Sequence, residues 1–292
     1  MILSLVKKTA RAFGVDTRAL YQNLSAASLR AAIKSQNLEP VCDRLRKIVP
    51  DLRGQYTIAF DEAEYRRYWE IKMRGLHAWQ TMMALDALAR IGRGGLMLAD
   101  IGDSSGNHGL YLGALAAPGM IARFISVNLD PVAVAKVQAK GGESILSRAE
   151  DLDLAGIRPD LFLSFETIEH LTDPVRFLHA LAEKGSADWM LVTVPYRRAS
   201  RFGGAHLRQP ESALPEQLTA EEVHIYEFSP EDWSLLARFA GWRPVETSVY
   251  RQYPSRGPWR LTAPLWRILD FEGFFGMILT RDLSLARRYS AW

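Results

Sequence analysis

Two carboxylates and an imidazole lie within five consecutive residues near the middle of the chain. Glu166, Glu169 and His170 are spaced i, i+3 and i+4, so a helical turn would place them on one face. Such a group could bind a divalent metal and leave coordination positions open for a substrate. A histidine there could also accept a proton, because its unperturbed pKa lies near neutrality. We therefore interpret this turn as the candidate catalytic centre.

A glycine-rich turn lies upstream, within residues 96–111. An apolar run ends at Asp100, Gly102 and Gly106 follow, and the pattern turns helical from His108 onward. A glycine loop between a strand and a helix lets backbone N–H groups and the helix N-terminus approach a ligand closely. After Gly102 the glycines fall at +4 and +7, whereas the dinucleotide fingerprint requires +2 and +5. We interpret the turn as a ligand-binding loop of another kind, with a tight turn that binds nothing as the alternative.

The pattern from residue 96 onward alternates between strands and helices, which predicts a mostly parallel sheet with helices on both faces. The strand candidates are residues 96–101, 122–128, 144–147, 160–165, 188–194, 242–250 and 274–280, and the helix candidates are 108–117, 131–139, 174–184 and 230–240. No clean crossover helix separates the last two strands, so we expect an antiparallel finish to the sheet. A long loop is expected over 196–222, and loops of that length are typical of functional segments.

Composition and charge limit the class of protein. A chain of 292 residues with 48% hydrophobic content can bury a full core, and one cysteine, Cys42, excludes an internal disulfide framework. No apolar run approaches the roughly 20 residues that span a bilayer, and the N-terminus is a poor secretion signal, so we expect a cytoplasmic protein. Residues 1–50 carry nine Lys or Arg against three Asp or Glu. Their rough helical stripe could make peripheral membrane contact, although packing against the main domain is favoured.

The domain organisation follows from these patterns. We expect a helical N-terminal cap over residues 1–75 and an α/β core over 76–292, with a lid insertion near 252–271. Arginines alternate with tryptophans and phenylalanines in and around this insertion, so it could stack on bases and bind phosphates. The favoured alternative is a packed lid helix, whose buried face would consist of Leu261, Leu265, Trp266 and Leu269.

The segment from Asp100 to Gly106 resembles the Asp-x-Gly-x-Gly-x-Gly loop of class I S-adenosylmethionine (SAM) methyltransferases, with Ser104 in place of the middle glycine. Asn128 stands where this family usually carries an acid that binds both ribose hydroxyls; Asp130 either compensates or caps the next helix. The resemblance implies a Rossmann-like seven-stranded sheet, mostly parallel with an antiparallel last strand, and SAM as cofactor. The cofactor-binding residues that it implies are Asp100, Gly102, Asp103, Ser104, Gly106, Asn128, Leu129, Ala149, Glu150 and Ser164.

The Glu-x-x-Glu-His arrangement resembles two metal-assisted methyltransferase groups, the ubiquinone-pathway O-methyltransferases and the small-RNA terminal 2′-O-methyltransferases. In the RNA group a further histidine precedes an aromatic-Glu-aromatic segment, and His224 with the residues after it is similar to that segment. This resemblance implies a divalent metal such as Mg²⁺ or Mn²⁺, held by Glu166, Glu169, His170 and His224. Metal-free members of the superfamily also carry a Glu-His pair here, so pocket shaping or general-base catalysis is the alternative. The expected catalytic residues are His170, Glu169 and His224.

The sequence therefore predicts a SAM-dependent methyltransferase that modifies a hydroxyl on a small molecule or a glycan sugar. Methylation of an RNA ribose is an alternative, although no recognisable RNA-binding module is present. Two further alternatives belong to other classes: a SAM-binding protein without catalysis and a nicotinamide-dependent sugar oxidoreductase or epimerase. The last would usually carry a Tyr-x-x-x-Lys pair, which we do not find.

Overall fold

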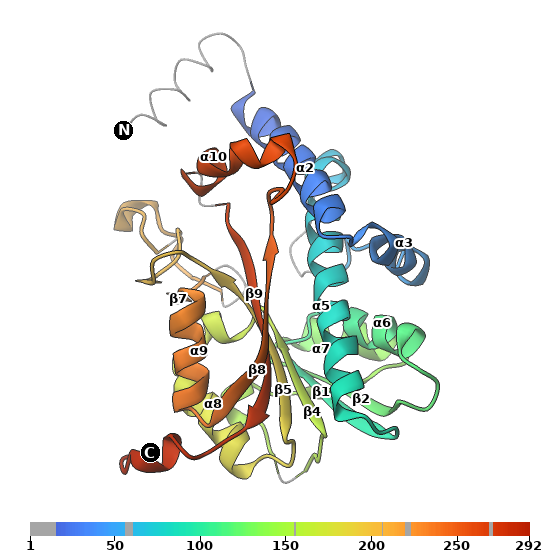
Figure 1. Cartoon of the computed structure of the whole chain (residues 1–292), viewed down its shortest axis with the longest axis vertical. Coiled ribbons are helices and arrows are strands. Elements are labelled where there is room, and N and C mark those ends of the chain that lie inside the picture. Colours follow the sequence, from blue (N-terminus) through green and yellow to red (C-terminus); the bar gives the residue numbers. More distant parts are fainter. Residues whose placement is uncertain (1–15, 56–60, 155, 206, 220–222, 269–270) are drawn as a thin grey trace. The chain divides into compact units, whose positions relative to one another are not determined.

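The computed structural model describes the chain except for residues 1–15, 56–60, 155, 206, 220–222 and 269–270 (Figure 1). The described residues form two compact units. Unit 1 takes those of Met1–Arg53, Ile58–Ala78 and Arg251–Phe271, and unit 2 takes those of Gly54–Thr57, Trp79–Tyr250 and Glu272–Trp292. Helix α5, Glu70–Ile91, continues through the boundary at Ala78, so its first part belongs to unit 1 and its second part belongs to unit 2.

Unit 2 is built on a seven-stranded sheet. Its strands are β1 Leu96–Ile101, β2 Ile121–Asn128, β3 Glu143–Leu146, β4 Leu161–Phe165, β5 Trp189–Tyr196, β8 Trp242–Arg251 and β9 Gly273–Arg281. Their order is β3-β2-β1-β4-β5-β9-β8; the pairs among β1 to β5 are parallel, and β9 is antiparallel to β5. This confirms the predicted Rossmann-like sheet with an antiparallel finish. The expected strands each lie within two residues of their predicted bounds.

The register of the parallel strands places their carboxyl ends at one edge. Ile101 of β1 is paired with Val127 of β2, and Phe165 of β4 is paired with Thr193 of β5. The segments that follow these strands therefore meet at this carboxyl edge, where open α/β sheets bind ligands.

Helices cover both faces of the sheet. They are α6 Asn107–Leu115, α7 Pro131–Ala139, α8 Pro174–Lys184 and α9 Pro230–Phe239. The view in Figure 1 has the second part of α5, from Trp79 onward, with α6 and α7 on one face of the sheet and α8 and α9 on the other. Three of these helices begin with proline after a capping side chain, from Asp130, Asp173 or Ser229, that accepts a backbone hydrogen bond. Proline at this position loses no hydrogen bond, and the cap satisfies one of the free N–H groups, so local sequence fixes these starts.

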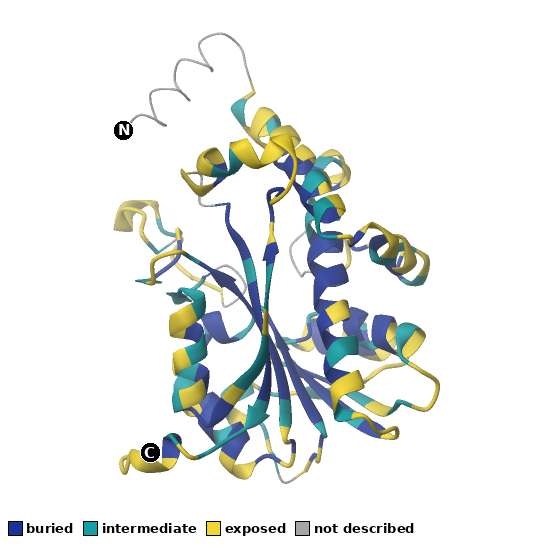
Figure 2. Ribbon diagram, in the orientation of Figure 1, coloured by how far each residue is buried: buried dark blue, intermediate teal, exposed yellow. Residues whose placement is uncertain are grey.

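The core of unit 2 lies between the sheet and its helices. Figure 2 shows the central strands as mostly buried, and side chains such as Phe162, Val192 and Met277 are completely buried. Trp233 of α9 is also fully buried, and its indole N–H donates to the Pro195 carbonyl at 3.3 Å. Aromatic side chains can be buried completely when their polar atom finds such a partner.

Short elements complete unit 2. Strand β6, Arg201–Phe202, pairs with β7, Tyr226–Glu227, so part of the segment predicted as a long loop is ordered in a two-stranded ladder. The remaining short helices are η2 Ala149–Asp151, η3 Ile168–His170, η4 Glu211–Ala213 and η6 Ala286–Arg288.

Unit 1 is helical. Its elements are α2 Thr17–Ser35, α3 Glu39–Ile48, α4 Glu62–Glu64, η1 Tyr65–Trp69, the first part of α5, η5 Pro258–Thr262 and α10 Ala263–Ile268. An apolar cluster joins α2 to the insertion through Ala26, Leu29, Tyr68, Tyr253, Trp266 and Phe271. The insertion is helical as expected, but its buried face differs from the prediction. Trp266 is buried, whereas Leu261 is 78% exposed and Leu265 is 50% exposed; Leu269 lies outside the described residues.

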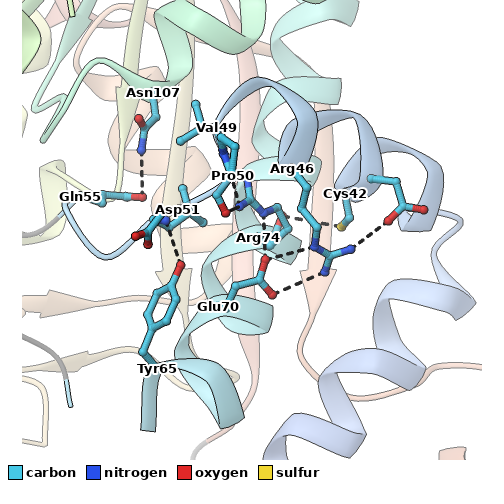
Figure 3. A network of polar contacts seen from close by, with 12 residues as sticks. Cys42, Arg46, Val49, Pro50, Asp51, Gln55, Tyr65, Glu70, Arg74 and Asn107 are labelled. Carbon is cyan, nitrogen blue, oxygen red and sulfur yellow. Dashed lines mark hydrogen bonds and ion pairs between the residues drawn. The ribbon is translucent and has the colours of Figure 1, made fainter. Parts of the chain in front are cut away.

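A buried arginine holds the first part of α5 to the preceding segment (Figure 3). Arg74 is completely buried, donates to the Val49 carbonyl at 2.9 Å and forms an ion pair with Glu70 at 3.1 Å. Glu70 also accepts from Arg46 at 3.2 Å. A buried charge is stable only when paired and hydrogen-bonded, and this network satisfies that requirement.

No described helix is long and apolar enough to cross a membrane. The rough apolar stripe that could contact a membrane peripherally is expected over residues 2–13, so it lies outside the described residues.

Candidate active site

The glycine loop lies at the carboxyl edge, between β1 and α6. Gly102 has a φ of +96° and Gly106 a φ of +75°, a region that glycine adopts readily. A Cβ atom on Gly102 would lie 2.0 Å from Thr167 Oγ1, so this loop packs directly against the turn after β4. The glycines are therefore required by backbone conformation and by this close contact.

Asp103 holds the loop together from inside. Its Oδ1 accepts from the N–H groups of Ser105 and Gly106, at 3.2 and 2.9 Å, and its Oδ2 accepts from the Ser126 hydroxyl at 2.6 Å. Only 5% of Asp103 is exposed. A buried carboxylate with three donors is well satisfied, so this side chain fixes the loop to β2.

Lys140 supports the same loop from the end of α7. Its Nζ donates to the Ser105 carbonyl at 2.6 Å and to Asn107 Oδ1 at 2.8 Å. Burial lowers the pKa of Lys140, and the nearby Asp103 carboxylate opposes that shift. Sequence reasoning missed this residue; its one signal is a lysine placed directly before Gly141 and Gly142 at the end of a predicted helix.

Asn128 ends β2 next to the loop. Its Nδ2 donates to the Asp103 carbonyl at 3.0 Å, and its Oδ1 accepts from the Asp130 N–H at 2.8 Å. Asp130 in turn accepts from the Val132 N–H at 2.8 Å, which is the capping role that the sequence left open. The amide of Asn128 therefore shapes the backbone at this edge, while one further N–H and one further oxygen lone pair stay available for a ligand.

The acidic turn after β4 differs from the helical turn that its spacing suggested. Glu166 has a φ of +52°, and the short helix η3 begins only at Ile168. Glu169 and His170 nevertheless come together with His224 from the segment before β7. One ligand atom from each of these three side chains lies within 4.8 Å of the other two. Glu166 is outside this cluster, although its charge acts on Glu169.

Glu169 is completely buried. Neither of its carboxylate oxygens has a hydrogen-bond partner among the residues that the structure describes. Burial raises the pKa of Glu169 well above its usual value, and the charges of Glu166 and Glu227 raise it further. An unsatisfied buried carboxylate is costly, so this position is suited to a group that binds there.

Backbone and side-chain acceptors orient both histidines. His170 Nδ1 lies 2.7 Å from the Val223 carbonyl, and His224 Nδ1 lies 3.1 Å from Glu227 Oε1. Because these acceptors require a donor, we assign a proton to Nδ1 in both rings, so Nε2 is the ring nitrogen that each histidine directs away from its acceptor. Burial and the nearby His224 lower the pKa of His170 to about 4. His170 is therefore neutral at pH 7.

Glu227 joins His224 to two arginines through hydrogen bonds. It accepts from Arg197 Nε at 2.7 Å, Arg201 Nε at 2.8 Å and His224 Nδ1 at 3.1 Å. Burial opposes ionisation of Glu227, but these hydrogen bonds hold its pKa below the usual range. Sequence reasoning did not assign roles to Glu227, Arg197 or Arg201, because the ladder of β6 and β7 that brings them together is a tertiary feature.

Comparison with known proteins agrees with this geometry. A family model described as a methyltransferase domain matches residues 100–183, which contain the glycine loop and the acidic turn. The chain contains a class I SAM-dependent methyltransferase domain. No curated protein matches it significantly.

Solved structures of other proteins have a similar fold. A chain of the complex between the Haloferax volcanii Trm112 methyltransferase activator and a proposed methyltransferase is 19% identical, with a TM-score of 0.51. The alignment covers 72% of this chain and 92% of that one. A proposed sarcosine dimethylglycine methyltransferase from Galdieria sulphuraria is 12% identical, with a TM-score of 0.50 over 84% of this chain and 98% of that one.

The remaining cofactor residues expected in this methyltransferase also lie after or near strand ends. Leu129 follows β2 and is 55% exposed, and Ala149 and Glu150 form η2 shortly after β3. Ser164 lies in β4 and is completely buried. The hydroxyls of Ser105 and Ser164 lack a hydrogen-bond partner within the described part of the chain. Such unsatisfied groups at a ligand-binding edge are suited to polar contacts with a cofactor.

Asp100 is the last residue but one of β1, two residues before Gly102, and is 1% exposed. The His108 imidazole lies beside it, with Asp100 Oδ2 and His108 Nδ1 3.4 Å apart. Burial raises the pKa of Asp100 to about 6, although the His108 imidazole acts in the opposite direction. Between pH 4 and 6 the unfolded chain loses this proton while the folded protein keeps it, so stability falls as pH rises.

We therefore expect Asp100→Asn to stabilise the cofactor-free methyltransferase above pH 6. The gain should be about 2 to 3 kcal/mol, because a shift of about two pKa units costs that much, and it should vanish below pH 4. Denaturant unfolding of both proteins from pH 4 to 8 measures it. Asp16→Asn is a control of opposite sign, because backbone hydrogen bonds lower the pKa of that exposed carboxylate. An equal gain for Asp100→Asn at pH 4 and pH 8 would show that the carboxylate is not the cause.

Proposed function

We propose that this methyltransferase transfers the SAM methyl group to a hydroxyl oxygen, assisted by a divalent metal at Glu169, His170 and His224. The observation that carries the proposal is the buried Glu169 carboxylate, which has no described hydrogen-bond partner and faces two imidazoles. A carboxylate with two imidazoles is a common donor set for Mn²⁺, Fe²⁺ or Zn²⁺. Glu166, close enough to influence Glu169, is the proposed fourth ligand.

The hydrogen bonds of both histidines support this proposal. Ligating histidines typically donate their second ring N–H to a carbonyl or a carboxylate. His170 has the Val223 carbonyl as this acceptor, and His224 has Glu227. Arg197 and Arg201 keep Glu227 ionised, so the orientation of His224 persists over the ordinary pH range.

Other residues of the chain are suited to position SAM and to remove the proton of the acceptor hydroxyl. We propose that Asp100, Gly102, Asp103, Ser104, Gly106, Asn128, Leu129, Ala149, Glu150 and Ser164 form the SAM site at the carboxyl edge. A bound divalent ion would lower the pKa of an acceptor hydroxyl. In a metal-free reaction His170 Nε2, unprotonated at neutral pH, would instead receive the proton of the acceptor hydroxyl.

The proposed acceptor is a small molecule or a glycan sugar. An RNA ribose is the second candidate, because His224 joins Glu169 and His170 as the resemblance to the RNA group implies. Transfer from labelled SAM to panels of catechols, glycans and RNA 3′ ends discriminates between the candidates.

The metal proposal is tested by titrating the cofactor-free protein with Mn²⁺ in a calorimeter. We expect one site, which should disappear in His224→Ala and in Glu169→Gln. SAM affinity in the same variants should stay within about threefold of wild type, because neither side chain belongs to the proposed SAM site. Leu235→Ala, at an exposed position of α9, is the matched control. Full methyl transfer in excess chelator, with no Mn²⁺ bound, would exclude the metal but leave the methyltransferase assignment intact.

A further inference from the structure

The helical insertion of unit 1 has an exposed apolar face. Leu261 is 78% exposed, Leu265 is 50% exposed and Ile268 is 70% exposed. Leu265 and Ile268 lie in α10 with the exposed Pro264, at spacings that one helix face covers, and Leu261 lies in η5 directly before that helix. Scattered exposed leucines are ordinary, but an exposed face of this regularity is typical of an interaction surface.

The other face of the same segment is packed. Trp266 is 5% exposed, and its ring lies 5.2 Å from that of Phe271 in the apolar cluster of unit 1. Its indole N–H also donates to Thr262 Oγ1 at 3.1 Å. The insertion is thus fixed to unit 1 by one face, so its apolar face is presented on an ordered element.

Positive charge borders the apolar face. Arg256, Arg260 and Arg267 are exposed, and no acidic residue occurs between positions 251 and 268. Arg260 lies in η5 and Arg267 lies in α10, so both short helices of the insertion carry an exposed arginine. Trp259, which is 67% exposed, adds an amphipathic ring of the kind that concentrates at membrane interfaces.

We propose that the segment 256–268 docks this methyltransferase on the surface of an anionic phospholipid membrane. The apolar face would enter the boundary between headgroups and acyl chains, and the arginines would meet lipid phosphates and acidic headgroups. Their long aliphatic stems allow this arrangement, because they can lie along apolar surface while the guanidinium stays in water. Leu261, Leu265 and Ile268 give no stacking surface to a base, so a lipid surface accounts for the exposed face better than a nucleic acid.

Vesicle co-sedimentation of the full chain tests the proposal. We expect binding to vesicles of phosphatidylcholine with 30% phosphatidylglycerol, and at least about tenfold weaker binding to phosphatidylcholine alone. Leu261→Glu with Ile268→Glu should weaken binding to the anionic vesicles at least about tenfold, because both side chains leave water on docking. The control is Met82→Glu with Leu235→Glu, two exposed apolar side chains of unit 2, which should bind as wild type.

The charge contribution is tested separately. Arg260→Gln with Arg267→Gln should lose most of the preference for anionic lipid, whereas Arg176→Gln with Arg238→Gln, two exposed arginines of unit 2, should not. All variants keep residues 1–15, so a loss of binding is assigned to the insertion, provided circular dichroism shows an unchanged fold. Failure of the wild type to bind either vesicle would overturn the proposal. So would unchanged binding of the Leu261–Ile268 double variant, or binding of single-stranded RNA through these residues without vesicle binding.

Discussion

Glu169→Gln should strongly slow methyl transfer while leaving the protein at least as stable as wild type. We expect kcat/KM to fall by about 1,000-fold, a loss typical of removing a group that stabilises developing charge in a buried site. SAM affinity should stay within about threefold. Activity is measured with labelled SAM on the acceptor found by screening, and stability by denaturant unfolding.

The physical reason is the environment of this carboxylate. Glu169 is completely buried, and its oxygens have no described hydrogen-bond partner, so folding alone gains nothing from its charge. A neutral amide of the same shape removes the cost of burying an acid near Glu166 and Glu227. Activity and stability should therefore change in opposite directions, as expected where stability is sacrificed for function.

A merely structural role predicts the reverse outcome. If Glu169 only supported the fold, Glu169→Gln would lower stability and activity together, or change neither. The matched control is Asp173→Asn, which alters an exposed carboxylate that caps α8 on the same connection. That change should leave stability within about 0.5 kcal/mol, because Asn caps a helix about as well as Asp, and should leave kcat/KM within about twofold.

Gly102→Ala should cause the largest loss of stability among single glycine changes in the cofactor loop. The added Cβ would lie 2.0 Å from Thr167 Oγ1, 2.8 Å from its Cγ2 and 2.9 Å from its Cβ, at a backbone φ of +96°. Backbone strain and overpacking each cost about 1–3 kcal/mol, so we expect a total of about 3–5 kcal/mol. Because the clash separates the loop from the acidic turn, SAM affinity should also fall at least about tenfold. Denaturant unfolding and calorimetry with SAM measure both effects.

The variant Gly95→Ala tests the cost of backbone strain without the steric contact that Gly102→Ala makes with Thr167. Gly95 has a φ of +71°, but a Cβ atom there would have no described atom within 4 Å. This variant should lose only about 1 kcal/mol and bind SAM normally. Thr167→Gly in the Gly102→Ala background should restore part of the lost stability, which a double-mutant cycle would detect. Equal losses in Gly95→Ala and Gly102→Ala would show that the contact with Thr167 is unimportant.

Local sequence determined the strands, the helices and the cofactor loop. Buried parallel strands are short continuous apolar runs, and helix starts are marked by Asp or Ser before Pro, so both signals are read over a few residues. The fold class followed from their alternation, and the resemblance of residues 100–106 to a methyltransferase motif agrees with the family match over residues 100–183.

Residue spacing gave a wrong local conformation where the backbone does not form a regular helix. The i, i+3, i+4 pattern of Glu166, Glu169 and His170 assumed a helical turn, but Glu166 adopts a left-handed conformation and the helix starts at Ile168. The predicted buried face of the lid helix was also wrong. Leucine occurs both in cores and on surfaces, so composition alone did not show that Leu261 and Leu265 are exposed and that Trp266 is buried.

By itself, the sequence of this protein determined which groups are present and which strands end beside them. Only the tertiary structure decided how those groups are connected: Lys140 holds the cofactor loop, Asn128 shapes the backbone, and Glu227 orients His224 between two arginines. The reason is that the contacts of Lys140, Asn128 and the two arginines join residues 25 to 35 positions apart, and His170 and Val223 are 53 positions apart. Strand order and register fix such pairs, and no local periodicity records them.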